Sequence, residues 1–184
     1  MKFKYLTVVM VFLLLVLSCK EEQIPKPKAQ IRLEYPLGKL ATIETKDFTF
    51  QYNEFANIES SGREAVTLSY PNMNGAIFIN YKSVGDNLDK LIKDAKRLSY
   101  EHATKADNIV EQPYVNPKAK VYGALFEVQG DAASQSQFYV TDSTKHFLTG
   151  AVYFYSKPNY DSILPAAAYL QNDIRRIIES IKWK

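Results

Sequence analysis

Five consecutive residues, Asp142 to His146, include the side-chain types that nucleophilic catalysis needs. A serine nucleophile requires a histidine within hydrogen-bonding reach, and that histidine requires an acid behind it. Residues this close around a hairpin tip rarely reach such an arrangement, whereas Asp and Ser are common turn residues. The chain also has no G-x-S-x-G motif. We therefore interpret Asp142-Ser143-Thr144-Lys145-His146 as a turn and predict no catalytic residue.

Few side chains are present for a metal or cofactor site. The chain has one cysteine and two histidines, and no H-x-x-x-H spacing includes His102. Seven scattered glycines form no phosphate-binding loop. We expect neither metal nor cofactor. A glycosidase-like enzyme needs two carboxylates that meet in space, whatever their spacing in the sequence, so this activity stays open. The acids in predicted loops are Glu54, Glu59, Asp131 and Asp161.

Tyrosine is frequent, with thirteen residues against one tryptophan. Tyr is favoured at recognition surfaces because it is large, stiff and amphipathic, and it is also an ordinary strand residue. The small polar loop 130–136 is either a contact loop or a tight connection between strands. We predict a partner-binding surface over the 130–146 region and the turn at 160–161, formed by Asp131, Ser134, Asp142, His146, Tyr160 and Asp161.

The order of periodic segments predicts strands, a helix, more strands and a second helix. The expected strands cover 31–35, 48–52, 65–70, 76–81, 109–114, 121–128, 135–141 and 146–155. The first helix is expected over 87–104, capped by Asp86 or Asn87. The second is expected to start at Asp161-Ser162, with Pro165 in its first turn.

Turn signals at 71–75 and 142–145 predict hairpins between the flanking strands. We therefore predict an α+β fold, with a mostly antiparallel sheet and the two main helices packed on it. By analogy of fold, this arrangement is similar to the Mog1/PsbP-like sandwich.

The N-terminus has the pattern of an export signal. Within residues 1–18, Lys2 and Lys4 precede an apolar run that is too short to span a bilayer, which takes about 20 residues. Val16-Leu17-Ser18-Cys19 resembles a bacterial lipobox, so we predict acylation of Cys19, the only cysteine. Residues 19–30 predict an extended, proline-containing tether, and residues 31–184 predict one α+β domain.

Charge and location follow from this N-terminus. The chain carries a formal charge of +3, and loss of residues 1–18 leaves 21 basic and 20 acidic side chains. No nucleic-acid partner is therefore expected. Lys20 stands where an aspartate retains many lipoproteins at the inner membrane, so we expect the outer membrane. Lys20-Glu21-Glu22 is similar to an export tag of surface lipoproteins but also fits a solvated tether, which leaves the periplasmic or surface orientation open.

Long segments of the chain resemble the gliding motility lipoprotein family GldD of the Bacteroidetes. They are the lipobox, PKPKAQIRLEYP, residues 122–166 and the final ESIKW. The resemblance implies a membrane-anchored lipoprotein required for gliding over surfaces and associated with the type IX secretion system. It supplies no catalytic residue, and only the acylated cysteine carries over, onto Cys19.

We therefore expect an anchored, non-enzymatic component of the gliding and secretion machinery that acts through contacts with its protein components. Two alternatives stay open. An envelope hydrolase acting on glycan or protein would need a pocket with converging acid or Ser/His groups. A small-ligand carrier would need a cavity between the layers of the fold.

Overall fold

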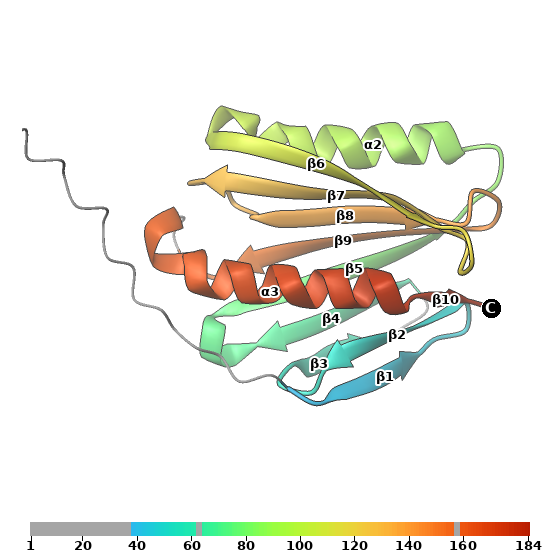
Figure 1. The fold of residues 1–184 in the computed structure, drawn as a ribbon, viewed down its shortest axis with the longest axis horizontal. Helices are drawn as coiled ribbons and strands as arrows, with labels where there is room; N and C mark the ends of the chain where they lie inside the picture. Colours follow the sequence, from blue (N-terminus) through green and yellow to red (C-terminus); the bar gives the residue numbers. More distant parts are fainter. Residues whose placement is uncertain (1–37, 62–63, 157–158) are drawn as a thin grey trace, which may run out of the picture. The chain divides into compact units, whose positions relative to one another are not determined.

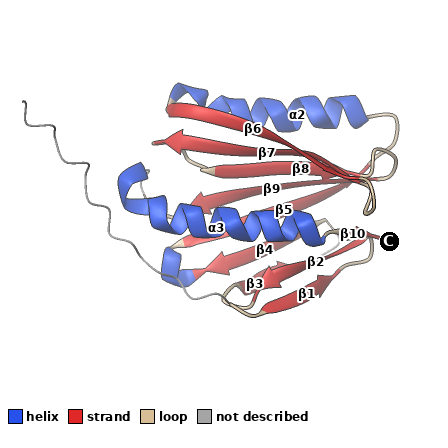
Figure 2. Cartoon of the chain, viewed as in Figure 1, coloured by secondary structure: helices blue, strands red, loops and turns tan. Residues whose placement is uncertain are grey.

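The computed structural model describes residues 38–61, 64–156 and 159–184, without the side chains of 60, 61, 102 and 103. The predicted signal peptide 1–18, lipidation site Cys19, tether 19–30 and strand 31–35 lie outside the described residues. In the part that is described, two α-helices accompany ten strands in two antiparallel sheets (Figure 2). The predicted α+β class, with a mostly antiparallel sheet, is confirmed.

The larger sheet has seven strands in the order β3-β4-β5-β9-β8-β7-β6 (Figure 1). The predicted hairpins are present at η1 (Pro71–Met73) with Asn74, and between β8 and β9. The pairing of β5 with β9 joins the two halves of the chain in the middle of the sheet. The strands are β3 (Asn57–Ser61), β4 (Ala65–Tyr70), β5 (Gly75–Ser83), β6 (Ala106–Asn116), β7 (Val121–Gly130), β8 (Ser136–Thr141) and β9 (His146–Phe154).

The two outermost strands of this sheet, β3 and β6, are irregular. The register of β3 shifts between Ile58 and Ser60, and that of β6 shifts between Ala106 and Asn108. β6 also contains Pro113, which fits an edge strand because proline cannot donate a ladder hydrogen bond. The pattern predicted only residues 109–114 of β6, since its exposed residues follow no strict alternation.

The smaller sheet pairs β1 (Leu40–Glu44) with β2 (Phe48–Asn53) and β2 with β10 (Lys182–Trp183). β1, β3 and β10 were not predicted. β10 has two residues, and β3 is polar around one isoleucine, so neither carries a readable alternation. β10 forms where the chain leaves the last helix and meets β2.

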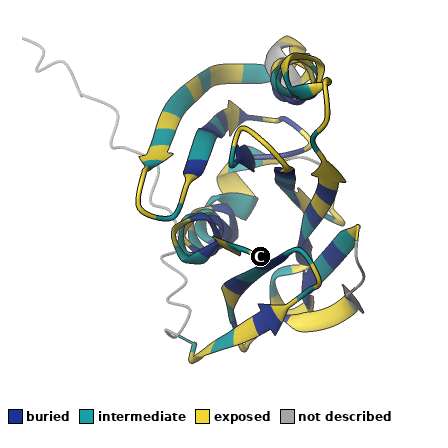
Figure 3. Ribbon diagram, turned by 90° about the vertical axis from the view of Figure 1, so that its right-hand side faces the viewer, coloured by how far each residue is buried: buried dark blue, intermediate teal, exposed yellow. Residues whose placement is uncertain are grey.

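The two helices lie on opposite sides of the seven-stranded sheet (Figure 3). α2 (Leu88–Tyr100) continues as the 3-10 helix η2 (Glu101–Thr104), close to the predicted 87–104. The predicted side-chain cap is absent, because Asn87 Oδ1 accepts from Gly85 N–H instead. α3 (Tyr160–Ser180) starts one residue before the predicted start, which places Pro165 beyond its first turn.

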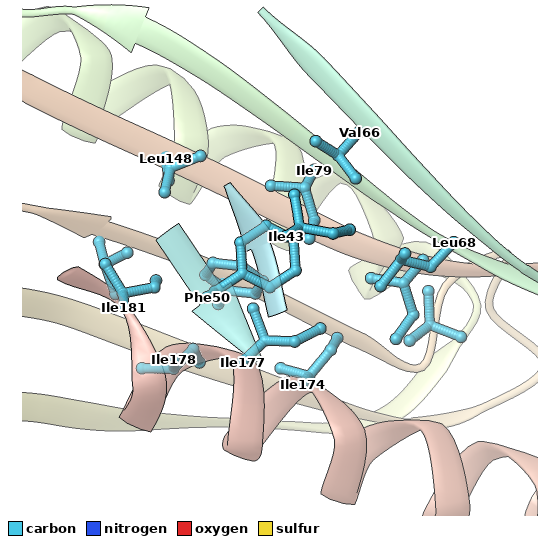
Figure 4. Close-up of a cluster of buried hydrophobic side chains, with 14 of the residues drawn as sticks. Ile43, Phe50, Val66, Leu68, Ile79, Leu148, Ile174, Ile177, Ile178 and Ile181 are labelled. Atoms are coloured by element: carbon cyan, nitrogen blue, oxygen red, sulfur yellow. The ribbon is translucent and has the colours of Figure 1, made fainter. Parts of the chain in front are cut away.

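The main core lies between the seven-stranded sheet on one side and α3 with the smaller sheet on the other (Figure 4). α3 contributes a fully buried stripe that includes Leu170, Ile174 and Ile177. Burying a side chain of this size stabilises the fold by about 1.5–3 kcal/mol. A second, smaller core of Leu91, Ala95, Phe126, Tyr139 and Phe147, among others, lies under α2.

Candidate functional site on the outer face of the sheet

The six residues predicted to form one partner surface lie in two groups at opposite ends of the sheet. The loop that leads from β7 into β8 carries Asp131 and Ser134, and the hairpin from β8 to β9 carries Asp142 and His146. Six residues of β8, about 20 Å of strand, separate these connections. Asp131 Oδ1 accepts the N–H of Tyr160 at 2.8 Å, which places Tyr160 and Asp161 in the first group.

Asp142 uses its carboxylate to build its own turn. Its Oδ1 accepts the N–H groups of Thr144, Lys145 and His146 at 2.8–2.9 Å, and its Oδ2 accepts the Thr144 hydroxyl at 2.8 Å. Partial burial opposes ionisation, but these hydrogen bonds outweigh it and lower the pKa of Asp142 to about 2. This geometry supports the interpretation of residues 142–146 as a turn.

His146 points away from Asp142. Its Nδ1 lies 3.0 Å from the Tyr81 hydroxyl, and its ring stacks on Trp183 with centroids 5.2 Å apart and planes 4° apart. The side chain is buried, so it does not belong to an exposed surface. Ser134 is also fully buried, and its hydroxyl donates to Ser136 O. Neither residue therefore offers an exposed side chain to the predicted partner surface, because His146 is covered by Tyr81 and Trp183 and the Ser134 hydroxyl bonds to the backbone of its own loop.

The loop 130–136 is a tight connection and not a contact loop. Gln135 Nε2 donates to Ala132 O at 2.8 Å and approaches Gly130 O at 3.4 Å. At the neighbouring start of α3, Asp131 and Asp161 remain exposed and Tyr160 is partly buried. Burial and the carboxylates of Asp107, Asp161 and Glu127 raise the pKa of Tyr160. This end of the sheet is therefore acidic.

An open surface on the face that α2 packs against was not predicted. α2 covers only part of the face it packs on, over β7, β8 and the start of β9. Beside it, cross-strand neighbours on the uncovered half form one row of Gln137, Ala151, Phe78 and Thr67 from four adjacent strands. A second row contains Thr149, Asn80 and Ala65.

A groove follows the border between α2 and this uncovered half. One part, of about 250 Å³, includes Phe78, Leu98, Gln137 and Tyr153, and an adjoining part, of about 760 Å³, shares Asn80, Leu98 and Thr149 with it. We call these two parts together the outer groove. Leu98 is 51% exposed and Tyr153 38% exposed, and the Tyr153 ring meets Phe78 edge to face at 5.8 Å.

The floor of the outer groove contains an unsatisfied polar group. Gln137 is 7% exposed, and its Oε1 lies 3.1 Å from the Ser99 hydroxyl of α2. Its Nε2 is buried and has no hydrogen-bond partner among the described residues. Such a group costs about 1–3 kcal/mol unless an acceptor reaches it. The alternation of side chains along β8 could have placed Gln137 on this face. How far α2 extends across the face cannot be read from the sequence.

A buried acid on α3 was also missed. Asp173 is 2% exposed, and it accepts hydrogen bonds from Asn53 Nδ2 at 3.1 Å, the Tyr70 hydroxyl at 3.0 Å and Arg176 at 3.1 Å. Burial raises the pKa of Asp173 despite these donors. Its position three residues after Leu170, on the apolar stripe of α3, was the available signal. The cluster ties α3 to β2 and β4.

A family model described as gliding motility lipoprotein GldD matches residues 20–183. The chain belongs to this family. No curated protein matches it.

Membership in the GldD family assigns the chain to gliding motility and to a lipid-anchored place in the cell envelope. Across the described ranges, no helix is long and apolar enough to cross a membrane. Within the same ranges, no three His, Cys, Asp or Glu residues group closely enough to hold a metal ion.

Proposed function

We propose that this chain is an accessory component of the gliding and type IX secretion machinery, anchored in the outer membrane through Cys19. It acts by binding another protein of that machinery in the outer groove. The observation that carries this proposal is the half-covered sheet face, where Phe78, Leu98 and Tyr153 meet water beside the unpartnered amide of Gln137.

The chemistry of the outer groove fits a protein partner. Aromatic and aliphatic side chains form its walls, and exposed apolar groups around a small number of polar groups are typical of interfaces. Gln137 Nε2 is itself buried, so a partner's backbone carbonyl would accept from it once the side chain turns toward the groove. The two acids of the lining, Glu64 and Glu101, lie in different parts of the groove, whereas a hydrolase of glycans would need a converging pair.

The groove is tested with Leu98→Lys, compared with the matched control Val115→Lys. Both positions expose an aliphatic side chain, at 51% and 66%, but Val115 lies on edge strand β6, outside the lining of the groove. We expect Leu98→Lys to reduce colony spreading and secreted protein while the protein accumulates normally, and Val115→Lys to leave both unchanged. Equal effects of the two variants would remove the groove from the proposal.

A second variant separates binding from folding. Gln137→Leu keeps the volume and removes the orphaned amide, and Ser99 Oγ retains Ala95 O as its acceptor at 3.1 Å. We expect unchanged or higher thermal stability together with reduced spreading. Normal spreading would mean that no partner uses this amide.

The role in the machinery is tested by deleting the gene and scoring secreted protein alongside colony spreading. We expect both to fail, and to be restored by the wild-type gene but not by Cys19→Ala. Continued secretion with failed spreading would place the protein in adhesin handling or the motor, and rescue by Cys19→Ala would contradict the need for an anchor.

A further inference from the structure

Three separate segments bring lysines together at the end of the sheet where β8 turns into β9. They surround an open hollow of about 600 Å³. We call it the basic hollow; its lysines are Lys118 and Lys120 from the β6–β7 turn, Lys145 from the β8–β9 turn, and Lys182 and Lys184 around β10. The chain as a whole is nearly balanced, with 23 basic and 20 acidic residues, so this concentration is local.

The backbone under these lysines is fixed by direct contacts. Trp183 Nε1–H donates to Lys120 O at 2.9 Å, and the Trp183 ring stacks on His146. Lys120 has the left-handed φ of 52°, and its N–H donates to Pro117 O at 3.3 Å. The three segments therefore hold one another, and the lysines extend from a common rigid base.

Most of the positive charge in the basic hollow is uncompensated. Asp142 is the one side-chain carboxylate of the lining and offsets one of the five lysine charges. Lys184 pairs with Glu44 at 2.7 Å. The other four lysines make no ion pair within the described residues. Asp107, Asp131 and Asp161 lie at the opposite end of the sheet.

We propose that the basic hollow rests on the anionic lipid headgroups of the membrane that carries the anchor. This inference relies on the lipid anchoring proposed above. Lysines near an anionic surface are attracted to it, and tryptophan is enriched at membrane–water interfaces. The carboxylates at the opposite end of the sheet are repelled by the same surface. The domain therefore stands with its strands directed away from the membrane.

The chain is long enough for this orientation. The 19 residue-to-residue steps from Cys19 to Gly38 reach at most about 65 Å, and the ten residues of β7 span about 33 Å. The anchor also holds the domain at a high local concentration of headgroups, so modest charge attraction is sufficient to orient it. Nucleic acid, a free anion and an acidic protein are weaker fits, because none is brought near the hollow by the anchor.

The only tryptophan of the chain, Trp183, lies in the basic hollow and reports on it directly. The lipidated full chain is reconstituted into vesicles with bromine-labelled acyl chains, either all zwitterionic or with about 30% anionic lipid. We expect at least twofold stronger quenching of Trp183 on the anionic vesicles, lost in about 0.5 M salt. The triple variant Lys118→Gln/Lys145→Gln/Lys182→Gln should lose this difference, and Lys39→Gln/Lys90→Gln/Lys93→Gln should keep it.

Equal quenching on both vesicle types, or a difference that survives in the first triple variant, would overturn the proposal. Loss of the quenching on adding inorganic phosphate at constant ionic strength would assign the hollow to a free anion and would equally overturn it. Flotation of the protein with both vesicle types measures the anchor separately. Failed flotation thus contradicts the anchoring, and failed quenching with intact flotation contradicts only the membrane contact of the hollow.

Discussion

Asp142 allows a charge effect on stability to be tested, because Asp142→Asn keeps the side-chain oxygen that accepts the turn N–H groups and removes the charge, together with the acceptor of the Thr144 hydroxyl. In the folded protein the pKa of Asp142 is about 2, against an ordinary value of 3.8. A difference of this size corresponds to about 2.4 kcal/mol at neutral pH, and solvent screening of a partly exposed group reduces it to about 1 kcal/mol.

The pH dependence gives the prediction its sign. Because the folded state holds the proton of Asp142 more weakly than the unfolded chain does, this contribution is complete above about pH 4 and is lost as the pH falls towards 2. We expect Asp142→Asn to lower the free energy of unfolding by about 1 kcal/mol at pH 7. Its curve should converge with that of the wild type in acid.

Urea unfolding at several pH values, followed by far-UV circular dichroism and Trp183 fluorescence, measures this difference. With a typical urea dependence, the midpoint should shift by about 0.3–1 M at pH 7. Asp86→Asn is the matched control, because it removes the same charge from an exposed loop position. A shift of equal size at every pH would refute the reasoning, since a lost charge cannot act where Asp142 is protonated in both states.

Changes at three further positions test the packing and the helix start. Asp173→Ala should lower the free energy of unfolding by about 3–5 kcal/mol in urea melts, because it leaves Arg176 and two buried donors without their acceptor. Because burial raises the pKa of Asp173 in the folded protein, the wild type should lose stability as the pH rises from 3.8 through that raised pKa. Asp173→Asn has no proton to lose and should not show this loss. An unchanged pH profile would contradict the burial effect. Gly150→Ala should cost about 1–3 kcal/mol in thermal melts, because the new Cβ would meet the Phe138 ring at 2.1 Å; a neutral result would mean that the ring moves freely. Asp131→Ala should cost about 0.5–2 kcal/mol through loss of the acceptor for Tyr160 N–H, whereas Asp131→Asn should retain most of the stability.

The sequence was sufficient for the elements that alternate or repeat clearly. The hairpins around Asn74 and at 142–145, the long strands β5, β7 and β9, and both helices follow from local periodicity and turn chemistry. Their sum correctly predicts an antiparallel α+β fold, because hairpins dictate antiparallel pairing. Family membership could also be recognised, because residues 122–166 form one long characteristic stretch.

The features that the sequence did not predict depend on tertiary contacts. Asp131 stabilises the start of α3 from a loop 29 residues earlier, and β10 forms because the chain after α3 pairs with β2. Asn87 and Ser162 are residue types that often cap helices. Here the Asn87 side chain accepts from Gly85 N–H, and the Ser162 hydroxyl donates to Asn159 O.

The prediction of a single partner surface was wrong for a related reason. Six residues were grouped by closeness in sequence and polarity, yet an antiparallel strand carries neighbouring turns to opposite ends of a sheet. Ser134 and His146 were placed on the partner surface and are buried, His146 under Tyr81 and Trp183 from distant strands. The outer groove depends on how far α2 reaches across the strands, which is a property of the assembled layers.

The irregular edges of the seven-stranded sheet affect how anchored copies of the domain interact on a membrane. Lipid-anchored domains are confined to two dimensions, where copies collide often. A straight, open edge would add a strand from a neighbouring copy. The bulges in β3 and β6, together with Pro113, interrupt the row of free backbone groups at both borders of the seven-stranded sheet. The edges of this sheet thus resist strand addition and leave recognition to its faces.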